Sequence, residues 1–211
     1  PLLLKLMSVC PLADLELEGV LRNIRSALMC SISELEGPSE VLRFQSALAL
    51  QCFTNEYVYE VSDTENKALK ALEARVSDTL LGGQQPNPHL VLCLASYKAL
   101  HEYEWCDLLA VTLDIEEVFT RQIIEPKQEV RMKPNIAALK EITNKVSSKV
   151  REQYEESPYP RWVDLGLRLK PATTSEVVND IKLRLFDNTI KDVDAPNILI
   201  AGCGTGQHSI G

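Results

Sequence analysis

The chain has 211 residues and a formal net charge of −8, and its 45% hydrophobic and 25% charged fractions are ordinary for a globular protein. The acidic charge argues against nonspecific binding to nucleic acid or anionic membranes, which both require basic patches. No segment has the roughly 18 uninterrupted apolar residues that crossing a bilayer requires. The six cysteines show neither a Cys-x-x-Cys pair nor metal-ligand spacing with the three histidines. We therefore expect a cytoplasmic protein from reducing surroundings, without a metal, nucleic-acid or membrane partner.

Apolar residues at three- and four-residue spacing predict helices in the first part of the chain. The first helix runs through Leu17 to Leu28 and is stopped by Gly37-Pro38. Ser39 is the expected N-cap of the next helix, which extends to about Val58. Ser62-Asp63-Thr64-Glu65 resembles a capping region for a third helix, which Gly82-Gly83 ends.

The rest of the chain before residue 190 also reads as helices joined by turns. The expected elements are helices from His89 to Glu102, from Glu116 to Ile124 and from Ile136 to about Glu156, a linker over 163–175 and a last helix over 176–186. Helix–loop–helix units of this length predict a mainly α fold, either a helical bundle or a short α-solenoid. No internal period is evident, so no named repeat is established.

A glycine-rich loop follows an apolar run near the end of the chain. Residues 198–201, Ile-Leu-Ile-Ala, predict a buried parallel strand, and Gly202, Gly204 and Gly206 come directly after it. A strand that runs into closely spaced glycines is how α/β folds bring backbone against a nucleotide, because a side chain would block the approach or forbid a positive φ. The alternative is a tight strand–helix turn without a ligand.

The sequence Gly202-Cys203-Gly204-Thr205-Gly206 resembles the first motif of class I S-adenosylmethionine-dependent methyltransferases, an apolar strand followed by Gly-x-Gly-x-Gly. The Rossmann dinucleotide pattern separates its last two glycines by two residues, whereas this loop separates them by one, which favours the methyltransferase over an NAD site. Ile200 departs from the family, because many members carry an acidic residue at that place. The resemblance implies that Gly202, Gly204 and Gly206 lie against the methionine moiety of S-adenosylmethionine.

A second stretch resembles the same family. Residues 153–162 read Gln-Tyr-Glu-Glu-Ser-Pro-Tyr-Pro-Arg-Trp and look like a signature of bacterial proteins that join a helical, often tetratricopeptide-like, region to a class I methyltransferase domain. By this resemblance Tyr154, Tyr159 and Arg161 are candidate cofactor-binding residues, and Arg161 offers donors suited to a carboxylate. An alternative, equally open, is an aromatic cluster that packs a helix against the linker.

The resemblance implies three parts. Residues 1–134 form a helical domain, residues 135–195 hold the long helix, the Tyr-Pro-Arg-Trp segment and the linker, and residues 196–211 begin a truncated Rossmann-like α/β domain. Catalytic residues would then lie beyond Gly211, and the methyl acceptor, for which a protein is one candidate, is unidentified. We thus expect an N-terminal fragment of a methyltransferase that is inactive by itself. The alternative is an α-helical protein-interaction module without catalytic activity.

Two histidines have more than one interpretation. His101, with Glu102, Glu104 and Cys106 nearby, suggests a metal site or a Cys/His nucleophile. Adjacent helical residues point in different directions, however, and no third ligand is spaced on the same face, so a structural histidine is the competing reading. His208 follows the glycine loop and could approach a cofactor carboxylate, or it is an incidental terminal residue.

The apolar run near residue 198 would leave its backbone N–H and C=O groups unpaired if it stood alone, which costs free energy. We therefore expect residues 197–211 either to be poorly ordered or to pair with a second copy of the chain as a homodimer through this strand.

Overall fold

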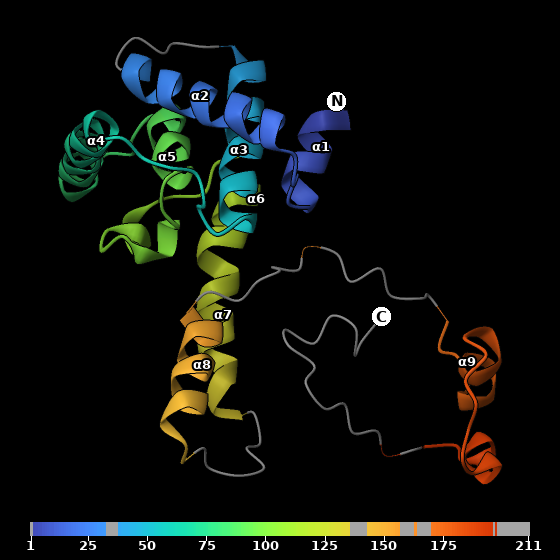
Figure 1. Ribbon diagram of the computed structural model, residues 1–211. Coiled ribbons are helices and arrows are strands. Elements are labelled where there is room, and N and C mark those ends of the chain that lie inside the picture. The colour runs from blue at the N-terminus through green and yellow to red at the C-terminus, as the bar shows by residue number, and fades with distance from the viewer. Residues whose placement is uncertain are drawn as a thin grey trace. The chain divides into compact units, whose positions relative to one another are not determined.

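The computed structural model describes residues 2–32, 38–135, 143–156, 163, 170–195 and 197. The regular elements in these ranges are all helical (Figure 1), so the predicted mainly α fold is confirmed for this part of the chain. The predicted strand at 198–201 lies outside it. The chain divides into two compact units, Pro1–Val163 and Asp164–Gly211.

The first unit is built around one central helix. Helix α3 (Ser39–Thr54) packs against α1 (Leu2–Val9) and α5 (Pro88–Ala95), while α2 (Leu15–Ser31) packs against α4 (Asp63–Leu81) and α5. Figure 1 shows this group of helices around α3. Two clusters of buried side chains result: one around α4, α5 and the segment after α5, the other between α1, α2 and α3.

The capping residues explain where several helices begin. Ser62 and Glu65 form a capping box within the predicted capping region at the start of α4, since the Ser62 side chain accepts from the Glu65 amide and Glu65 accepts from the Ser62 amide. Asp14 caps α2 through the Leu17 amide. The prediction that Ser39 is the N-cap of α3 is wrong. Pro38 occupies the cap position without a side-chain bond, and Ser39 is the first helical residue.

Helix α3 also ends earlier than predicted. It stops at Thr54 and not near Val58, because Glu56 and Tyr57 adopt left-handed backbone angles, with φ of 57° and 55°. The Tyr57 amide donates to the Cys52 carbonyl at 2.8 Å, which closes the C-terminal turn. Two successive residues other than glycine in this conformation are unusual and define the turn after α3.

Two further helix boundaries differ from the sequence prediction. Helix α5 ends at Ala95 and not at Glu102, and a short 3₁₀ turn, η2 (Leu100–Glu102), follows. Helix α8 (Lys145–Glu156) begins nine residues after Ile136, because the Asn144 side chain accepts from the Val146 and Ser147 amides and so caps it there.

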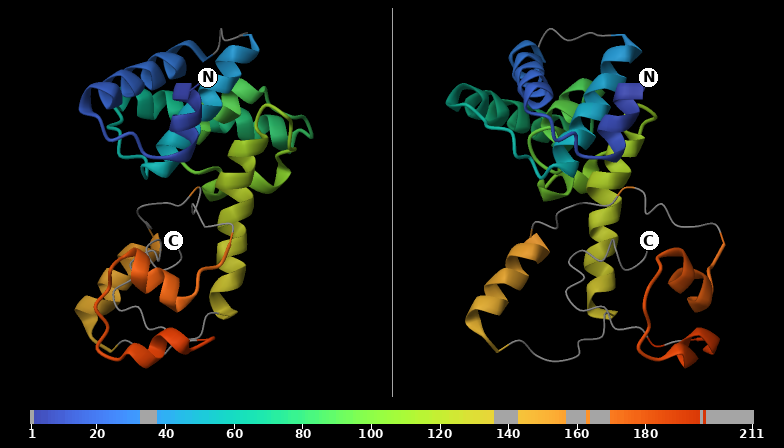
Figure 2. Two further views of the ribbon diagram at one scale, coloured as in Figure 1. Left: turned by 90° about the vertical axis from the view of Figure 1, so that its right-hand side faces the viewer. Right: turned by 45° about the vertical axis from the view of Figure 1, so that its right-hand side comes forward.

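One long helical run leads out of the first unit's core. It consists of α6 (Glu116–Phe119), the π-helical segment η4 (Thr120–Ile124) and α7 (Glu125–Met132), so the helix predicted to end at Ile124 continues to Met132. Figure 2 shows the run as a continuous rod that extends from the packed helices. Lys133, just after α7, pairs with Glu155 of α8 at 2.6 Å.

The second unit contains α9 (Thr174–Asp180) and the 3₁₀ segment η6 (Asn188–Asp192). Thr173 and Glu176 form a capping box at the start of α9. The helix ends before residue 186, where it was predicted to end, and Lys182 has a left-handed φ of 53°. No helix in the described ranges of either unit combines the length and the apolar character that a membrane span needs.

Candidate functional site

The residues predicted to bind the cofactor fall almost entirely outside the described part of the chain. Gly202, Gly204, Gly206, Tyr159 and Arg161 are all outside the described residues. Tyr154 belongs to α8, but only its backbone is described. The structure therefore does not test whether these residues form one cofactor site, and the site stays a prediction from the sequence. His208 and Cys203 are likewise outside the described residues.

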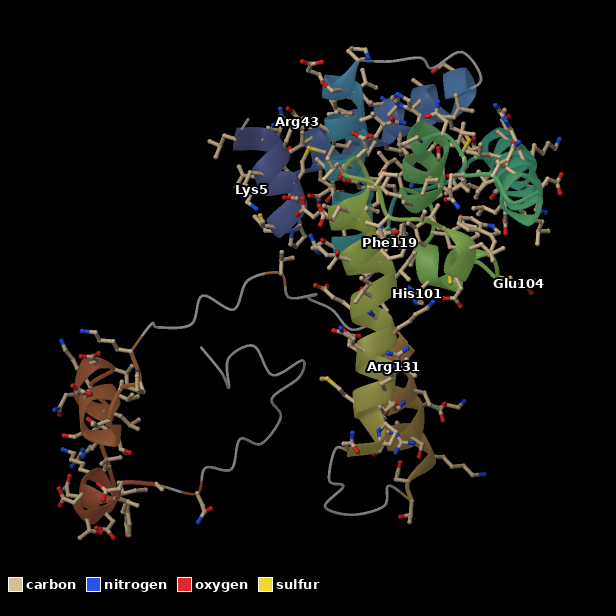
Figure 3. All side chains as sticks on the ribbon, turned by 180° about the vertical axis from the view of Figure 1, so that it is seen from behind. Lys5, Arg43, His101, Glu104, Phe119 and Arg131 are labelled. Atoms are coloured by element: carbon tan, nitrogen blue, oxygen red, sulfur yellow. The ribbon has the colours of Figure 1, made fainter. Side chains whose placement is uncertain are left out.

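His101 has a structural role in the first unit. Its Nδ1 atom lies 2.9 Å from the carbonyl oxygen of Gln122, and because a carbonyl only accepts, Nδ1 carries the proton. Cys106 points its thiol at the His101 carbonyl, 3.8 Å away, and not at the imidazole ring. Glu104, in the segment between His101 and Cys106, is exposed (Figure 3). The Cys/His nucleophile is therefore not assembled.

A metal site at His101 is also not formed. Within the described ranges, no group of three or more His, Cys, Asp or Glu side chains could hold a metal ion. Cys106 instead accepts a hydrogen bond from the Lys127 ammonium at 3.4 Å, and Lys127 forms an ion pair with Asp107. These contacts tie the loop after η2 to α7.

Gln122 joins three elements from the π-helical segment. Its side chain is fully buried. The amide nitrogen donates to the carbonyls of Ala49 in α3 and Ala95 in α5, at 3.2 and 3.1 Å, and the amide oxygen accepts from the Leu100 amide at 3.1 Å. A π-helical turn shifts the side chains that follow it around the axis, and here it accompanies a glutamine that faces the core.

Arg25 is the centre of a second buried polar network. It is 1% exposed, its Nη2 donates to the Glu60 carbonyl at 2.8 Å, and its guanidinium carbon lies 4.2 Å from the ring centroid of Tyr97. The Tyr97 hydroxyl donates to Glu65 Oε1 at 2.7 Å. The network thus links α2, the turn before α4, α4 itself and the residues after α5.

Electrostatics in this network favour a structural role over a catalytic one. Burial raises the pKa of the Cys52 thiol to about 12, although the neighbouring Arg25 guanidinium acts in the opposite direction. Burial also acts to raise the pKa of Glu65, but hydrogen bonds from Ser62 and Tyr97 and the charge of Arg25 outweigh it and hold that pKa below 4.5. Cys52 therefore stays a neutral thiol and Glu65 a carboxylate near neutral pH.

A cavity of about 420 Å³, here named the acidic pocket, opens beside this network. It lies between the turn that joins α1 to α2 and the C-terminal end of α3. Two carboxylates, Glu18 and Glu56, belong to its wall together with the amide side chain of Asn55. The lining residues are Pro11, Leu12, Ala13, Glu18, Gln51, Asn55, Glu56 and Val58.

A second cavity of about 310 Å³ lies between α1, α3 and the start of α6. Its wall carries charges of both signs, Lys5 and Arg43 against Asp114 and Glu117. Figure 3 shows Lys5 on α1 and Arg43 on the neighbouring α3. Because these charges are balanced, this cavity selects for no particular ligand charge.

The sequence reading missed the acidic pocket and the Arg25 network. Arg25 lies between Leu21 and Met29 on the buried face of α2, at four-residue spacing. An arginine at an otherwise apolar position of a helix is a sequence signal for a buried polar network. The acidic pocket has no such signal, because its wall comes from residues about 40 positions apart in the chain. No family model, curated protein or solved structure matches this chain.

Proposed function

We propose that this chain belongs to an S-adenosylmethionine-dependent methyltransferase in which a helical unit precedes the cofactor-binding domain. The observation that carries the proposal is the glycine loop after an apolar run, with Gly202, Gly204 and Gly206 at single-residue spacing. S-adenosylmethionine would supply a methyl group on a positively charged sulfur, and the enzyme would contribute mainly positioning and the exclusion of water. The three glycines let the backbone approach that cofactor.

The division of the chain supports such an organisation. The helical unit ends at Val163, directly after the Tyr-Pro-Arg-Trp segment, and the glycine loop belongs to the second unit. Under this proposal Tyr154, Tyr159 and Arg161 cover the cofactor from the N-terminal side. We further propose a cytoplasmic location, which accords with the five free cysteines in the described part of the chain.

Isothermal titration with S-adenosylmethionine tests the proposal on protein made from the complete reading frame that contains residues 1–211. The variant Gly204→Ala adds a methyl group where the backbone would meet the cofactor, and we expect it to weaken binding. Gly19→Ala is the matched control, because a Cβ at Gly19 has no atom within 4 Å. No binding by the unmodified protein, or equal binding by both variants, would refute the proposed site.

A helical protein-interaction module is the second candidate function. The observation that favours it is the pair of open cavities on the helical unit, each formed by segments that are separated in the sequence. Helical arrays present such surfaces to partner chains. Failure of cofactor binding, together with selective capture of a protein partner that is lost when a cavity residue is changed, would favour this candidate over the enzyme.

A further inference from the structure

The cavity between α1, α3 and the start of α6 carries two charges of each sign and is here named the mixed-charge cavity. Its volume of about 310 Å³ is at the lower end of the range for small-molecule sites. The basic side chains, Lys5 and Arg43, lie on the neighbouring helices α1 and α3 (Figure 3). The acidic side chains, Asp114 and Glu117, lie just before and within the first turn of α6. The two signs therefore come from different segments of the chain.

These four charged side chains are not used within the fold. None of them makes an ion pair or a hydrogen bond within the described part of the chain. All four are exposed, so a ligand can engage either sign without first breaking an ion pair of the protein. Because the charges balance, the wall does not select by net charge. It distinguishes ligands by how charge is distributed within them, since each sign on the ligand needs its opposite on the wall.

Three leucines add an apolar part to the same wall. Leu4 and Leu42 are half-buried, whereas Leu113 is 93% exposed. An aliphatic group that covers Leu113 removes apolar surface from water on both partners, which is favourable. The cavity thus combines an apolar contact with charges of both signs.

We propose that the mixed-charge cavity binds a free α-amino acid with an aliphatic side chain, in its zwitterionic form. The guanidinium of Arg43 has a fork of donors that matches a carboxylate, and Lys5 adds a second cation. Asp114 and Glu117 accept hydrogen bonds from an α-ammonium group, which has three N–H donors. The aliphatic side chain contacts the leucines of the wall.

Other classes of small ligand satisfy this wall less well. A purely anionic ligand would face the carboxylates of Asp114 and Glu117, and a purely cationic ligand would face Lys5 and Arg43. An uncharged apolar ligand would displace water from all four charges without replacing its hydrogen bonds, which costs free energy. The site is built from the first unit alone and does not depend on the proposed methyltransferase activity.

The experiment titrates the 211-residue chain with four small probes and follows the amide signals of Ser8, Ala47 and Leu113 by NMR. Leucine carries both charges and an aliphatic side chain. N-acetyl-leucine lacks the ammonium group, leucinamide lacks the carboxylate, and glycine lacks the side chain. The titrations are made at about pH 6.5, where α-amino groups are protonated. We expect leucine to bind with a dissociation constant on the order of millimolar, and each of the other probes to bind at least about tenfold more weakly.

Each probe tests one part of the proposal. No shift of these amides with leucine overturns it. Equal binding of N-acetyl-leucine or of leucinamide does so as well, because either result would show that the cavity recognises a single charge. Equal binding of glycine would contradict the assignment to aliphatic amino acids, since the leucines of the wall would then contribute nothing.

Two matched pairs of variants separate the cavity from general electrostatics. Glu117→Gln removes a carboxylate from the wall, whereas Glu116→Gln removes one from the same turn of α6 outside the cavity. Arg43→Gln removes a cation from the wall, and Arg75→Gln removes one from α4, away from it. All four side chains are exposed, so the variants should fold. We expect leucine affinity to fall about tenfold in Glu117→Gln and in Arg43→Gln and to stay unchanged in the two controls. No loss in the wall variants, or equal losses in walls and controls, would overturn the proposal.

Discussion

His101 supplies the hydrogen bond that Pro126 cannot. In an α-helix the amide of residue 126 would donate to the Gln122 carbonyl, but proline has no N–H. The Nδ1 atom of His101 lies 2.9 Å from that carbonyl oxygen and so satisfies it from outside the helix. This contact explains how a proline is accommodated within the helical run from Glu116 to Met132, and it gives His101 a structural function.

Replacing His101 should therefore destabilise the first unit through the carbonyl it leaves unpaired. We expect His101→Ala to lower the free energy of unfolding by about 1–2 kcal/mol, as measured by urea denaturation. Pro126→Ala restores an amide that can donate to Gln122. The double variant should therefore lose less stability than the sum of the two single variants. Strict additivity would show that the two residues do not share this carbonyl.

Arg25 and Arg22 offer a second matched comparison on the same helix. Arg25→Lys removes the fork of donors that reaches the Glu60 carbonyl and the stacking on Tyr97, and we expect a loss of about 2–3 kcal/mol in unfolding free energy. Arg22→Lys alters only an exposed ion pair with Glu60 at 3.7 Å, and its effect should remain within about 0.5 kcal/mol. Similar losses in the two variants would contradict a structural role for the Arg25 network.

The low pKa of Glu65 predicts acid sensitivity of the first unit. A carboxyl group whose pKa is lower in the folded state contributes stability that is present above its unfolded pKa and is lost as the pH falls through the folded value. Stability should therefore fall as the pH drops below about 4.5, the unperturbed value. Tyr97→Phe removes one of the hydrogen bonds that lower this pKa, so its Glu65 should titrate at a higher pH. Carboxyl chemical shifts followed from pH 3 to 6 by NMR measure this difference.

Cysteine reactivity should follow burial. Burial raises the pKa of both Cys52 and Cys93 to about 12, and both thiols are nearly inaccessible. Cys30 is exposed on α2. With a thiol reagent at pH 8, Cys30 should react within the first minutes, and Cys52 and Cys93 only after unfolding, since the thiolate is the reacting species. Rapid labelling of Cys52 in the native protein would mean that the contact between α2 and α3 opens readily.

The Tyr-Pro-Arg-Trp segment gives a prediction for the complete protein. If Arg161 binds the carboxylate of S-adenosylmethionine, Arg161→Ala should weaken cofactor binding by roughly 1.5–3 kcal/mol, the range for a hydrogen bond to a charged group. The melting temperature of the cofactor-free protein should remain nearly unchanged. Calorimetric titration and thermal unfolding measure the two quantities. Lost stability with unaltered affinity would instead identify the segment as structural packing.

The sequence by itself determined the helical character of the described chain and several of its boundaries. Helices α2, α3 and α4 follow from apolar spacing, and the Ser62–Glu65 capping box from four adjacent residues, because these signals are local. The glycine loop near residue 202 is likewise a local signal, and it alone carries the methyltransferase proposal.

Only the tertiary structure decided the features that depend on distant partners. Helix α5 stops at Ala95, and the Leu100 amide beyond it donates to the Gln122 side chain 22 positions later. The acidic pocket unites Glu18 with Asn55, and Arg25 reaches the carbonyl of Glu60. Such contacts form only when packing brings separated segments within hydrogen-bonding distance, and helical periodicity carries no information about which segments will meet.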